Sequence, residues 1–417
     1  MHYSQAAVER AMKIQEVMLR AISKKITWWQ AAEILGLSCR QMRRWKRRYE
    51  EHGYNGLFDH RWGKPSPRRV PLETVERVLL LYREQYFDFN VRHFHEKLKT
   101  EHDIHLSYTW VKCALQGAGL VKKTRARRAH RKRRERRPLP GMLLHIDAST
   151  HRWFADSRRF DFLVIMDDAS SEVYYAQLVE QEDTRGVLRA LRQVVEERGI
   201  FCALYSDRAS HFYLTPRAGE MVDRFRLTQV GRAMQQLGIH MIAAYSPQAR
   251  GRSERGFRTW QGRLPQELRL QGLRTVDEAN AWLREHYIKA FNEKFMVVPA
   301  HMGTAFVSLK RKDLELVFSL QHERVVNRDN TVSFANLCLQ IERVKWRGSL
   351  AGCRVTVYEH LDQKLSIGYG PHIVGNYSAD GKSLVVNKVK PKRKSQRRNQ
   401  LSKRTDDALQ KADILMC

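Results

Sequence analysis

Three acidic residues stand where their carboxylates could act together. Asp147 lies within an apolar stretch at 142–149 that predicts a buried strand, Asp207 ends a second such stretch at 201–207, and Glu254 opens a predicted helix. Three converging carboxylates would bind hard divalent cations, and Mg²⁺, with Mn²⁺ as a substitute, takes oxygen ligands and accepts substrate phosphate. Two such ions activate a water or a 3′-hydroxyl and stabilise the leaving oxygen of a phosphodiester.

Each acid taken alone also has an ordinary structural explanation. An acid at the end of a strand is usually a turn former or a helix cap, and a Glu in the first helical turn is favoured by the helix dipole. We interpret Asp167 and Asp168 in this way, because they end the predicted strand at 160–170 in a turn. The three acids together are harder to explain structurally: if the first and fourth strands are neighbours, Asp147 and Asp207 lie side by side.

The elements that would position these acids alternate along the chain. Short apolar runs predict strands, and longer runs with a helical period predict helices. The predicted strands cover 142–149, 160–170, 173–180, 201–207 and 239–246, and the predicted helices cover 184–198, 219–237 and a stretch that starts near 253. This order predicts a mixed five-stranded α/β sheet covered by helices.

The N-terminal residues carry the pattern of a helix-turn-helix unit. Helices are predicted over 5–22, 28–35 and 39–52, with a turn at Gly36 and a cap at Ser38. The third helix has one apolar and one basic face, as a recognition helix needs in the major groove. Its basic face, which we predict to contact DNA, consists of Arg40, Gln41, Arg43, Arg44, Arg47 and Arg48. The alternative is a basic surface helix in an ordinary bundle.

A second helical group follows, and its last helix favours a second helix-turn-helix unit. The predicted helices cover 72–86, 90–101 and 107–117. Four histidines cluster in this group: His93, His95, His102 and His105. We interpret them as core or surface residues rather than as zinc ligands, because Cys113 is the only nearby thiol and no paired-ligand spacing is present.

The C-terminal part changes to short β segments from about residue 322. About five such segments, separated by turn residues such as Ala379-Asp380-Gly381, predict a small all-β barrel. We expect this domain to bind DNA or a sister subunit.

The charge of the chain is strongly positive. Its 417 residues include 75 Lys and Arg against 45 Asp and Glu, a net charge of +30. Two tracts, 121–137 and 388–404, supply 19 of these 30 charges and cannot pack, because like charges repel. Such a chain favours nucleic acid as its partner, and the first tract would track DNA phosphates.

The sequence also bears on location. No apolar run approaches the roughly 18 residues of a membrane span, and charges stand early where a signal peptide needs an apolar core. Six scattered cysteines without a Cys-x-x-Cys pair fit a reducing compartment. We therefore expect a cytoplasmic protein without a membrane partner.

Three segments resemble the catalytic segments of DDE transposases and retroviral integrases: HIDAS, LYSDRASHF and YSPQARGRSERGFRTWQGRL. The most specific is the Tyr-x-Pro-Gln-x-x-Gly-x-x-Glu-Arg pattern from Tyr245 to Arg255. The arrangement of nearly the whole chain is similar to that of bacterial insertion-sequence transposases of the ISNCY group. The resemblance implies an RNase H-like core and a Mg²⁺-dependent cut-and-join reaction on DNA.

The resemblance also implies roles for individual residues. The three acids match the catalytic, metal-binding acids of the family. Gln248 and Arg250 lie in the segment that matches a mobile loop at the active site, and Arg258 and Gln261 match DNA-contacting positions on the helix face of the third acid. The 46 residues between the second and third acids exceed the integrase spacing, and we place the extra length at 212–228 as an inserted surface segment.

We therefore expect a DNA transposase on the bacterial nucleoid. It would bind double-stranded DNA at the terminal inverted repeats of its element, free a 3′-hydroxyl by hydrolysis, and direct that hydroxyl at target DNA as a polynucleotidyl transferase. Holding two ends together requires self-association into a synaptic multimer. One alternative is a non-catalytic helix-turn-helix regulator derived from a transposase. Another is an RNase H-type nuclease, which duplex-reading helices disfavour.

The predicted domains follow from these patterns. They are a helix-turn-helix domain at 1–58, a second one at 70–120, a basic linker at 121–140, an RNase H-like integrase core at 141–300, a linker at 301–321, a small β-barrel at 322–388 and a basic disordered tail at 389–417.

Overall fold

The computed structural model describes residues 3–59, 69–123, 135–215, 221–223, 225–245, 251–309 and 313–384. The chain forms two compact units, Met1–Glu84 with Lys112–Val121, and Gln85–Val111 with Lys122–Cys417. The region predicted at 70–120 as one domain is therefore divided between the units. Most of the first basic tract and the whole tail at 389–417 lie outside the described residues.

The first unit begins with the predicted helix-turn-helix. Its elements are α1 (Gln5–Ile22), α2 (Trp28–Ile34), α3 (Cys39–His52), the 3₁₀ helix η1 (Gly53–Leu57) and α4 (Leu72–Glu84). Thr27 and Ser38 cap α2 and α3 by accepting the backbone N–H groups of Gln30 and Gln41. Ala31, Ala32 and Met42 are buried together with the apolar side of α1 and form the core of the unit.

The 3₁₀ helix η1 packs directly on the backbone of α3. A Cβ atom placed on Gly56 would lie 2.1 Å from the carbonyl oxygen of Arg48, closer than van der Waals contact permits. Only a glycine therefore lets η1 approach α3 this closely. The neighbouring Leu57 and Phe58 are buried in the core of the unit, so this approach completes the core.

The second unit is built around a five-stranded mixed sheet. Its strands are β1 (Leu144–His151), β2 (Phe160–Asp167), β3 (Val173–Val179), β4 (Ala203–Ser206) and β5 (His240–Ala243), in the order β3-β2-β1-β4-β5. The pairs β1–β2 and β2–β3 are antiparallel, and β1–β4 and β4–β5 are parallel. The predicted mixed sheet is confirmed, including the neighbouring first and fourth strands.

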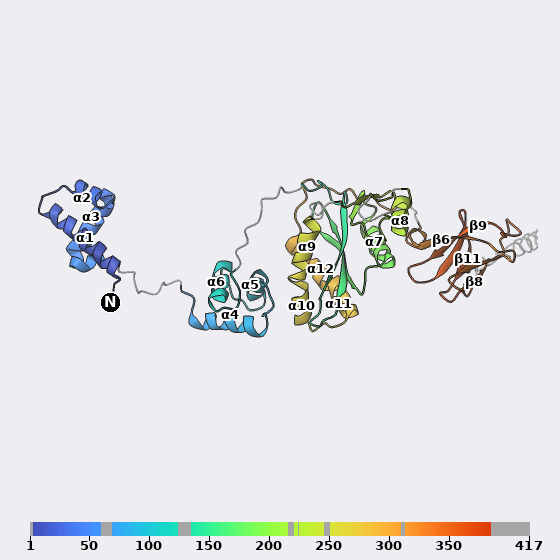
Figure 1. Ribbon diagram of the computed structural model, residues 1–417, viewed down its shortest axis with the longest axis horizontal. Helices are drawn as coiled ribbons and strands as arrows, with labels where there is room; N and C mark the ends of the chain where they lie inside the picture. Colours follow the sequence, from blue (N-terminus) through green and yellow to red (C-terminus); the bar gives the residue numbers. More distant parts are fainter. Residues whose placement is uncertain are drawn as a thin grey trace, which may run out of the picture. The chain divides into compact units, whose positions relative to one another are not determined.

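Helices cover both faces of this sheet (Figure 1). One layer consists of α7 (Thr184–Arg198) and α8 (Gln229–Leu237). The other consists of α9 (Gly251–Gln261), α10 (Leu264–Leu270), α11 (Val276–Trp282), the π-helical turn η2 (Leu283–Tyr287) and α12 (Ile288–Phe295), of which only α9 was predicted. The helix predicted over 219–237 was too long: α8 begins at Gln229, because Thr228 accepts the Gly231 N–H and caps it there.

Side chains of the strands alternate between the two helical layers. Phe162, Val164 and Met166 of β2 belong to the core shared with α9, α10 and α12. Leu163 and Ile165 belong to the core shared with α7 and α8, as do Leu144 and Ile146 of β1. This period of two assigns the odd-numbered residues of β1 to the face that α9 covers.

Two segments predicted as linkers are in fact bound to the core. Arg136 Nη1 donates to the carbonyl oxygen of Asp168 at 2.9 Å, and the Arg137 N–H donates to the Asp168 carboxylate at 2.9 Å. Val307 forms a β-bridge with Ile200, and Phe306 packs against the hydrophobic core. Hydrogen bonds to Asp168 hold the first segment in place, and a β-bridge with apolar burial holds the second; sequence patterns of loops reveal neither.

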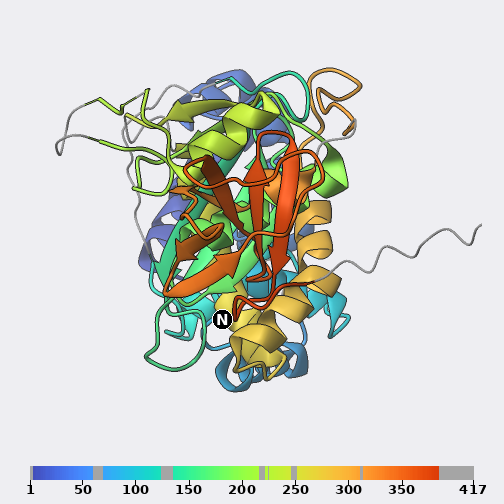
Figure 2. The ribbon, with the colours of Figure 1, turned by 90° about the vertical axis from the view of Figure 1, so that its right-hand side faces the viewer.

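The C-terminal part is all-β, as predicted. Its elements are α13 (Leu314–Val317), β6 (Leu320–Val325), β7 (Thr331–Phe334), β8 (Leu337–Gln340), β9 (Arg354–Glu359), β10 (Leu365–Tyr369) and β11 (His372–Tyr377). They form a four-stranded antiparallel sheet, β11-β10-β9-β6, and a β7-β8 hairpin around one core (Figure 2). The predicted domain began at residue 322, but its first strand, β6, begins at Leu320. Phe318, just before this strand, is buried in the hydrophobic core under α7 and α8.

A second helical segment of this unit lies outside the sheet. It comprises α5 (Val91–Thr100) and the start of α6 (Tyr108–Gly117), a helix that crosses the boundary between the units. None of the described helices has the length and apolar character to span a membrane.

Replacing Gly56 by Ala should destabilise the helix-turn-helix unit. The added methyl group must push η1 away from α3, and we expect a loss of about 2 kcal/mol or more. Gly117→Ala is the matched control, because no atom lies within 4 Å of the place that its added Cβ would take. Thermal melting followed by circular dichroism measures both variants, and equal melting profiles for Gly56→Ala and wild type would contradict this account.

Candidate active site and DNA-binding surface

The first two acids are carried by adjacent parallel strands. The register pairs Leu144 with Leu204 and His145 with Tyr205. Continuing it by two residues places Asp147 beside Asp207, directly after the end of β4. Asp207 also accepts the backbone N–H of Ala209 through Oδ1 at 3.0 Å, which shapes the turn after the strand. Both side chains are half-buried.

Helix α9 lies over the odd-numbered face of β1. Asp147 lines a small hollow together with Gly256, Phe257 and Trp260 of α9. At the end of the helix, Gln261 Nε2 donates to Ser149 Oγ at 2.9 Å. The helix that carries the third acid therefore crosses the strand that carries the first.

The third acid, Glu254, lies at the N-terminal end of this helix. Glu254 is exposed in the first turn of α9, next to the segment 246–250. Gln248 and Arg250 fall in that segment and lie outside the described residues. Over the described part of the chain, no three His, Cys, Asp or Glu side chains lie close enough together to hold a metal ion. The structure thus carries Asp147 and Asp207 on or next to the adjacent strands β1 and β4 and packs α9 on β1 at Asp147, and the described residues do not form a three-ligand group.

The two other residues predicted on α9 differ in their surroundings. Arg258 is exposed, as a DNA contact requires. Gln261 is half-buried, and its amide holds α9 on β1 through Ser149. DNA contact by either residue stays a prediction, whereas the structure gives Gln261 a packing role in addition.

Asp167, the last residue of β2, and Asp168, which follows it, have the structural role predicted for them. Asp167 accepts the backbone N–H groups of Gly141 and Ser170 at 2.9 and 2.8 Å. Asp168 accepts His145 Nε2–H at 2.7 Å, and both side chains of that pair are almost fully buried. Buried carboxylates in such networks hold a turn together and are not available to a substrate.

The predicted recognition helix presents its basic residues to solvent. Arg40, Gln41, Arg43, Arg44 and Arg47 are exposed on α3. Arg48 is different: it is half-buried, its Nη2 donates to the Phe58 carbonyl oxygen at 2.5 Å, and its guanidinium lies over the Trp45 ring. Its first role is therefore to join α3 to the residues after η1.

The four histidines have hydrogen-bond partners of their own. His95 Nε2 bonds to the Leu106 carbonyl oxygen at 2.8 Å, His102 to the Tyr86 hydroxyl at 3.0 Å, and His105 to the Asp103 carboxylate at 2.8 Å. His93 bonds to Glu267 at 2.6 Å. These contacts support the interpretation of the cluster as structural.

The contact between His93 and Glu267 belongs to a network that sequence reasoning missed. Glu96 and Lys97 of α5 join it, together with Arg263 of the α9–α10 junction. The spacing of His93, Glu96 and Lys97 places them on one face of a helix, which was the available signal. Their partners lie about 170 residues away in the sequence, where no local pattern indicates them.

Burial and pairing change the pKa values of this network. Burial lowers the pKa of His93 below its ordinary value, and this outweighs the neighbouring Glu267 carboxylate. His93 Nδ1 is buried without a hydrogen-bond partner in the described structure, which also favours the neutral ring with its proton on Nε2. For Glu267, burial alone would raise the pKa, but the hydrogen bonds from His93 and Lys97 keep it below its usual value.

Family models match the N-terminal part of the chain. A helix-turn-helix domain model matches residues 15–66, and a homeodomain-like domain model matches residues 41–115. With the core described above, these matches define a protein in which helix-turn-helix elements precede a mixed five-stranded α/β core.

Two sequence relatives identify the family. The protein named as transposase y4bF of Sinorhizobium fredii (strain NBRC 101917 / NGR234) is 30% identical over 370 residues, which cover 88% of this chain and 80% of that protein. The transposase for insertion sequence IS1202 of Streptococcus pneumoniae is 28% identical over 357 residues, which cover 77% of this chain and 76% of that protein. The chain therefore belongs to the family of insertion-sequence transposases.

Two solved structures of viral integrases match parts of the chain. The HTLV-2 integrase catalytic core domain in complex with magnesium matches 36% of this chain and 88% of its own, with a TM-score of 0.27 and 16% identity. The simian T-cell lymphotropic virus intasome in complex with PP2A regulatory subunit B56 gamma matches 68% of this chain and 92% of its own, with a TM-score of 0.30 and 13% identity. The family assignment rests on the sequence relatives.

Arg44 and Arg48 should respond differently to replacement by Ala. Arg48→Ala removes a charged hydrogen bond inside the unit and should lower its stability by about 1–2 kcal/mol. Arg44→Ala should leave stability unchanged, weaken DNA binding, and reduce the slope of log affinity against log salt by about 1. Thermal melting and salt-dependent binding titrations measure the two effects, and identical behaviour of the variants would refute the distinction.

The stability of the α5–α10 contact should fall as the pH drops below about 6.5, the ordinary pKa of His93. Below that pH the unfolded segment binds a proton that the folded one, with its lowered pKa, does not. The free energy of local opening should decrease by up to about 1.4 kcal/mol per pH unit. Hydrogen exchange of α10 amides, corrected for the intrinsic pH dependence of exchange, measures this, and His93→Gln should flatten the profile; an unchanged slope in that variant would contradict the assignment.

Proposed function

We propose that this protein is an active DNA transposase that cleaves and joins DNA strands with Asp147, Asp207 and Glu254. One observation supports the proposal: the parallel register of β1 with β4, continued by two residues, brings Asp147 level with Asp207, and the helix with Glu254 packs on β1 at Asp147. Membership of the transposase family supports the same chemistry. A regulator without catalysis has no use for acids on these three elements.

The donor chemistry of this site suits Mg²⁺. Asp147, Asp207 and Glu254 offer carboxylate oxygens, which are the ligands of hard divalent cations, and a small set of them leaves room for substrate phosphate. When bound, the metal ions supply activation of the attacking hydroxyl and stabilisation of the leaving oxygen. Asp147 and Asp207 would hold them from the sheet, and Glu254 from α9.

The reaction consists of two displacements at phosphorus. In the first, water attacks the phosphodiester at the end of the element, the P–O3′ bond breaks, and a 3′-hydroxyl and a 5′-phosphate are released. In the second, that 3′-hydroxyl attacks a target phosphodiester, a new P–O bond forms, and the target strand leaves with its own 3′-hydroxyl. The chain would contribute by orienting the strand, and the exposure of Arg258 on α9 beyond Glu254 supports a role for it in binding the phosphates.

The helix-turn-helix helices would supply recognition of the terminal repeats. Helix α3 exposes four arginines and one glutamine, and Arg and Gln pair with guanine and adenine edges in the major groove. Binding two ends for joining implies a multimer on DNA, which we propose without a stated number of subunits.

The test is metal-dependent cleavage of the element's own end. Duplex oligonucleotides that carry the inverted repeat from the DNA flanking the gene are incubated with Mg²⁺ or Mn²⁺ and the protein. Wild type should nick at the repeat boundary. Asp207→Asn and Glu254→Gln should reduce nicking at least about a hundredfold and leave the affinity for the end duplex nearly unchanged.

Glu293→Gln is the matched control, because Glu293 is an exposed acid on α12, away from β1. Its cleavage should equal that of wild type. Equal cleavage by Glu254→Gln and wild type would contradict the assignment of the three acids as catalytic residues. Binding of the end duplex without nicking, also with both ends paired, would instead favour the regulator.

A further inference from the structure

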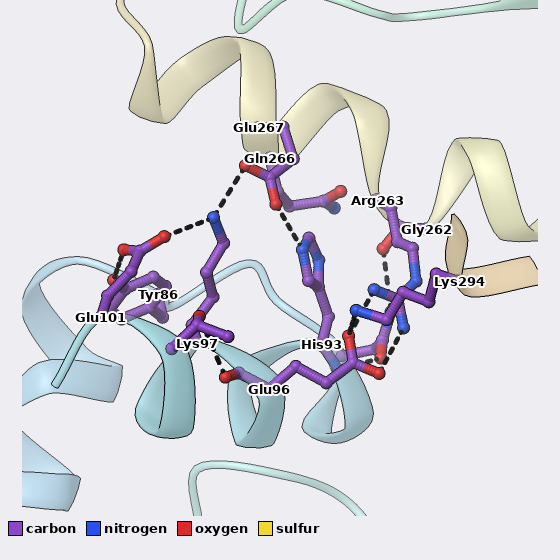
Figure 3. A network of polar contacts seen from close by, with 12 residues as sticks. Tyr86, His93, Glu96, Lys97, Glu101, Gly262, Arg263, Gln266, Glu267 and Lys294 are labelled. Carbon is purple, nitrogen blue, oxygen red and sulfur yellow. Dashed lines mark hydrogen bonds and ion pairs between the residues drawn. The ribbon is translucent and has the colours of Figure 1, made fainter. Parts of the chain in front are cut away.

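The helical segment Gln85–Val111 is fastened to the catalytic core by polar contacts along one face of α5 (Figure 3). At its start, Asn90 Nδ2 donates to the carbonyl oxygen of Gly262 at 2.8 Å. Glu267 of α10 accepts from His93 Nε2 at 2.6 Å and from Lys97 Nζ at 3.0 Å. Each contact joins residues of α5 to the α9–α10 part of the core.

A second group of ion pairs lies beside the first. Arg263 binds both carboxylate oxygens of Glu96, at 2.7 and 3.1 Å, and Lys294 of α12 pairs with the same carboxylate. Lys97 also pairs with Glu101 at 2.6 Å, and Glu101 accepts the Tyr86 hydroxyl. Figure 3 shows these side chains meeting between α5 and α10.

The loop before α5 adds a third contact. Arg269 of α10 binds both oxygens of Asp88, at 2.7 and 3.0 Å, and donates to the Gln85 carbonyl oxygen at 2.7 Å. Its guanidinium also lies over the ring of Phe87. Bidentate pairs of this kind fix orientation as well as distance, because two parallel bonds allow only one geometry.

Two charges at the centre of the contact, those of Arg263 and Glu267, are withdrawn from water, together with the neutral ring of His93. The side chains of His93, Arg263 and Glu267 are only 3%, 8% and 8% exposed. A buried charge is tolerated only with its partner in place, so sliding of α5 along α10 would leave charges unpaired. The contact therefore has one favourable register rather than a continuum of them.

The network contacts the C-terminal end of α9, the helix that carries Glu254. Helix α9 ends at Gln261, and the contact residues Gly262 and Arg263 follow immediately. Glu254 stands eight residues before Gly262, a distance of about 12 Å along a helix. Because Gln261 is also bonded to Ser149 of β1, the junction of α9 and α10 is held from two sides.

The other side of the contact belongs to the DNA-binding region. The homeodomain-like match at 41–115 includes all of α5, and the segment continues without interruption into α6. A displacement of this segment by bound DNA would therefore be transmitted through α5 to the α9–α10 junction.

We propose that the α5–α10 contact transmits end binding to the active site, with Asp88, Glu96, Arg263, Glu267 and Arg269 as positioning residues. They hold the segment Gln85–Val111, which would move with the bound terminal repeat, at a fixed register relative to α9. Glu254 then lies at the phosphate that is to be cleaved. The inference rests on the proposed function for its cleavage readout, and on the structure alone for the coupling.

The Asp88–Arg269 pair offers the sharpest test, because both side chains are partly exposed and tolerate substitution better than the buried pairs. Asp88→Arg and Arg269→Asp each break the pair, and the double variant restores it with the charges exchanged. Glu293→Arg is the charge-reversal control, because Glu293 on α12 is exposed. All variants are used as full-length protein with the end duplex described above.

Two readouts are compared: the distribution of nick positions, and hydrogen exchange of α9 amides with and without the end duplex. We expect the single variants to bind the duplex within about threefold of wild type. They should nick at least about tenfold more slowly, with nicks spread over neighbouring phosphates, and α9 should no longer respond to the duplex. The double variant should recover a single nick position and the response of α9, and the control should match wild type.

A purely structural contact would give a different result. The single variants would then melt at lower temperature, but their nick position and the α9 response would stay as in wild type, which would overturn the proposal. Absence of any α9 response to the duplex in wild type would overturn it as well. If wild type shows the α9 response without nicking, and the single variants lose that response, the coupling stands and the proposed catalysis fails.

Discussion

The parallel pairing of β1 with β4 is the constraint on which the remainder of the α/β core depends. Its register, continued by two residues, brings Asp147 of β1 level with Asp207, which directly follows β4. The antiparallel partner β2 then continues the sheet on the other side, and alternation along β1 sends Leu144 and Ile146 to one helical layer and Asp147 to the other. A slip of one residue would exchange these faces and bury the acid in the apolar core, so the register is strongly specified.

Polar contacts set orientation in this molecule, and apolar contacts supply cohesion. The aromatic residues Trp153, Phe162, Trp260 and Phe291 hold the α9–α12 layer on the sheet. The bonds that set the direction of α9 are fewer: Gln261 with Ser149 at its end, and the α5–α10 network just beyond. Hydrophobic packing is not directional, whereas bidentate ion pairs and amide bonds are, so a small number of them defines how the elements meet.

Much of the fold could be predicted from the sequence because the signals were local. Helix α1 and helix α7 begin and end where their period and caps predicted, since the amphipathic pattern and residues such as Gly199 act within a few positions. The three acids were selected in the same way, from their places within a strand, at the end of a strand and at the start of a helix. The start of α8 was missed, because no Gly or Pro between 220 and 228 marks the boundary in the sequence, whereas the Thr228 cap marks it in the structure.

By itself, the sequence determined the five strands of the sheet, most of the helices outside α10–α12, the acids on these elements and the basic helix, because these depend on neighbours within a turn or a strand. Only the tertiary structure decided that Arg48 binds Phe58, that Arg136 and Arg137 belong to the core, and that α5 is joined to α10. Nothing in the segment of His93 indicates Glu267 as its partner, and nothing near Glu267 indicates His93. They become a buried pair only when 174 positions of chain are folded back, and a contact of that range leaves no periodic trace in a single sequence.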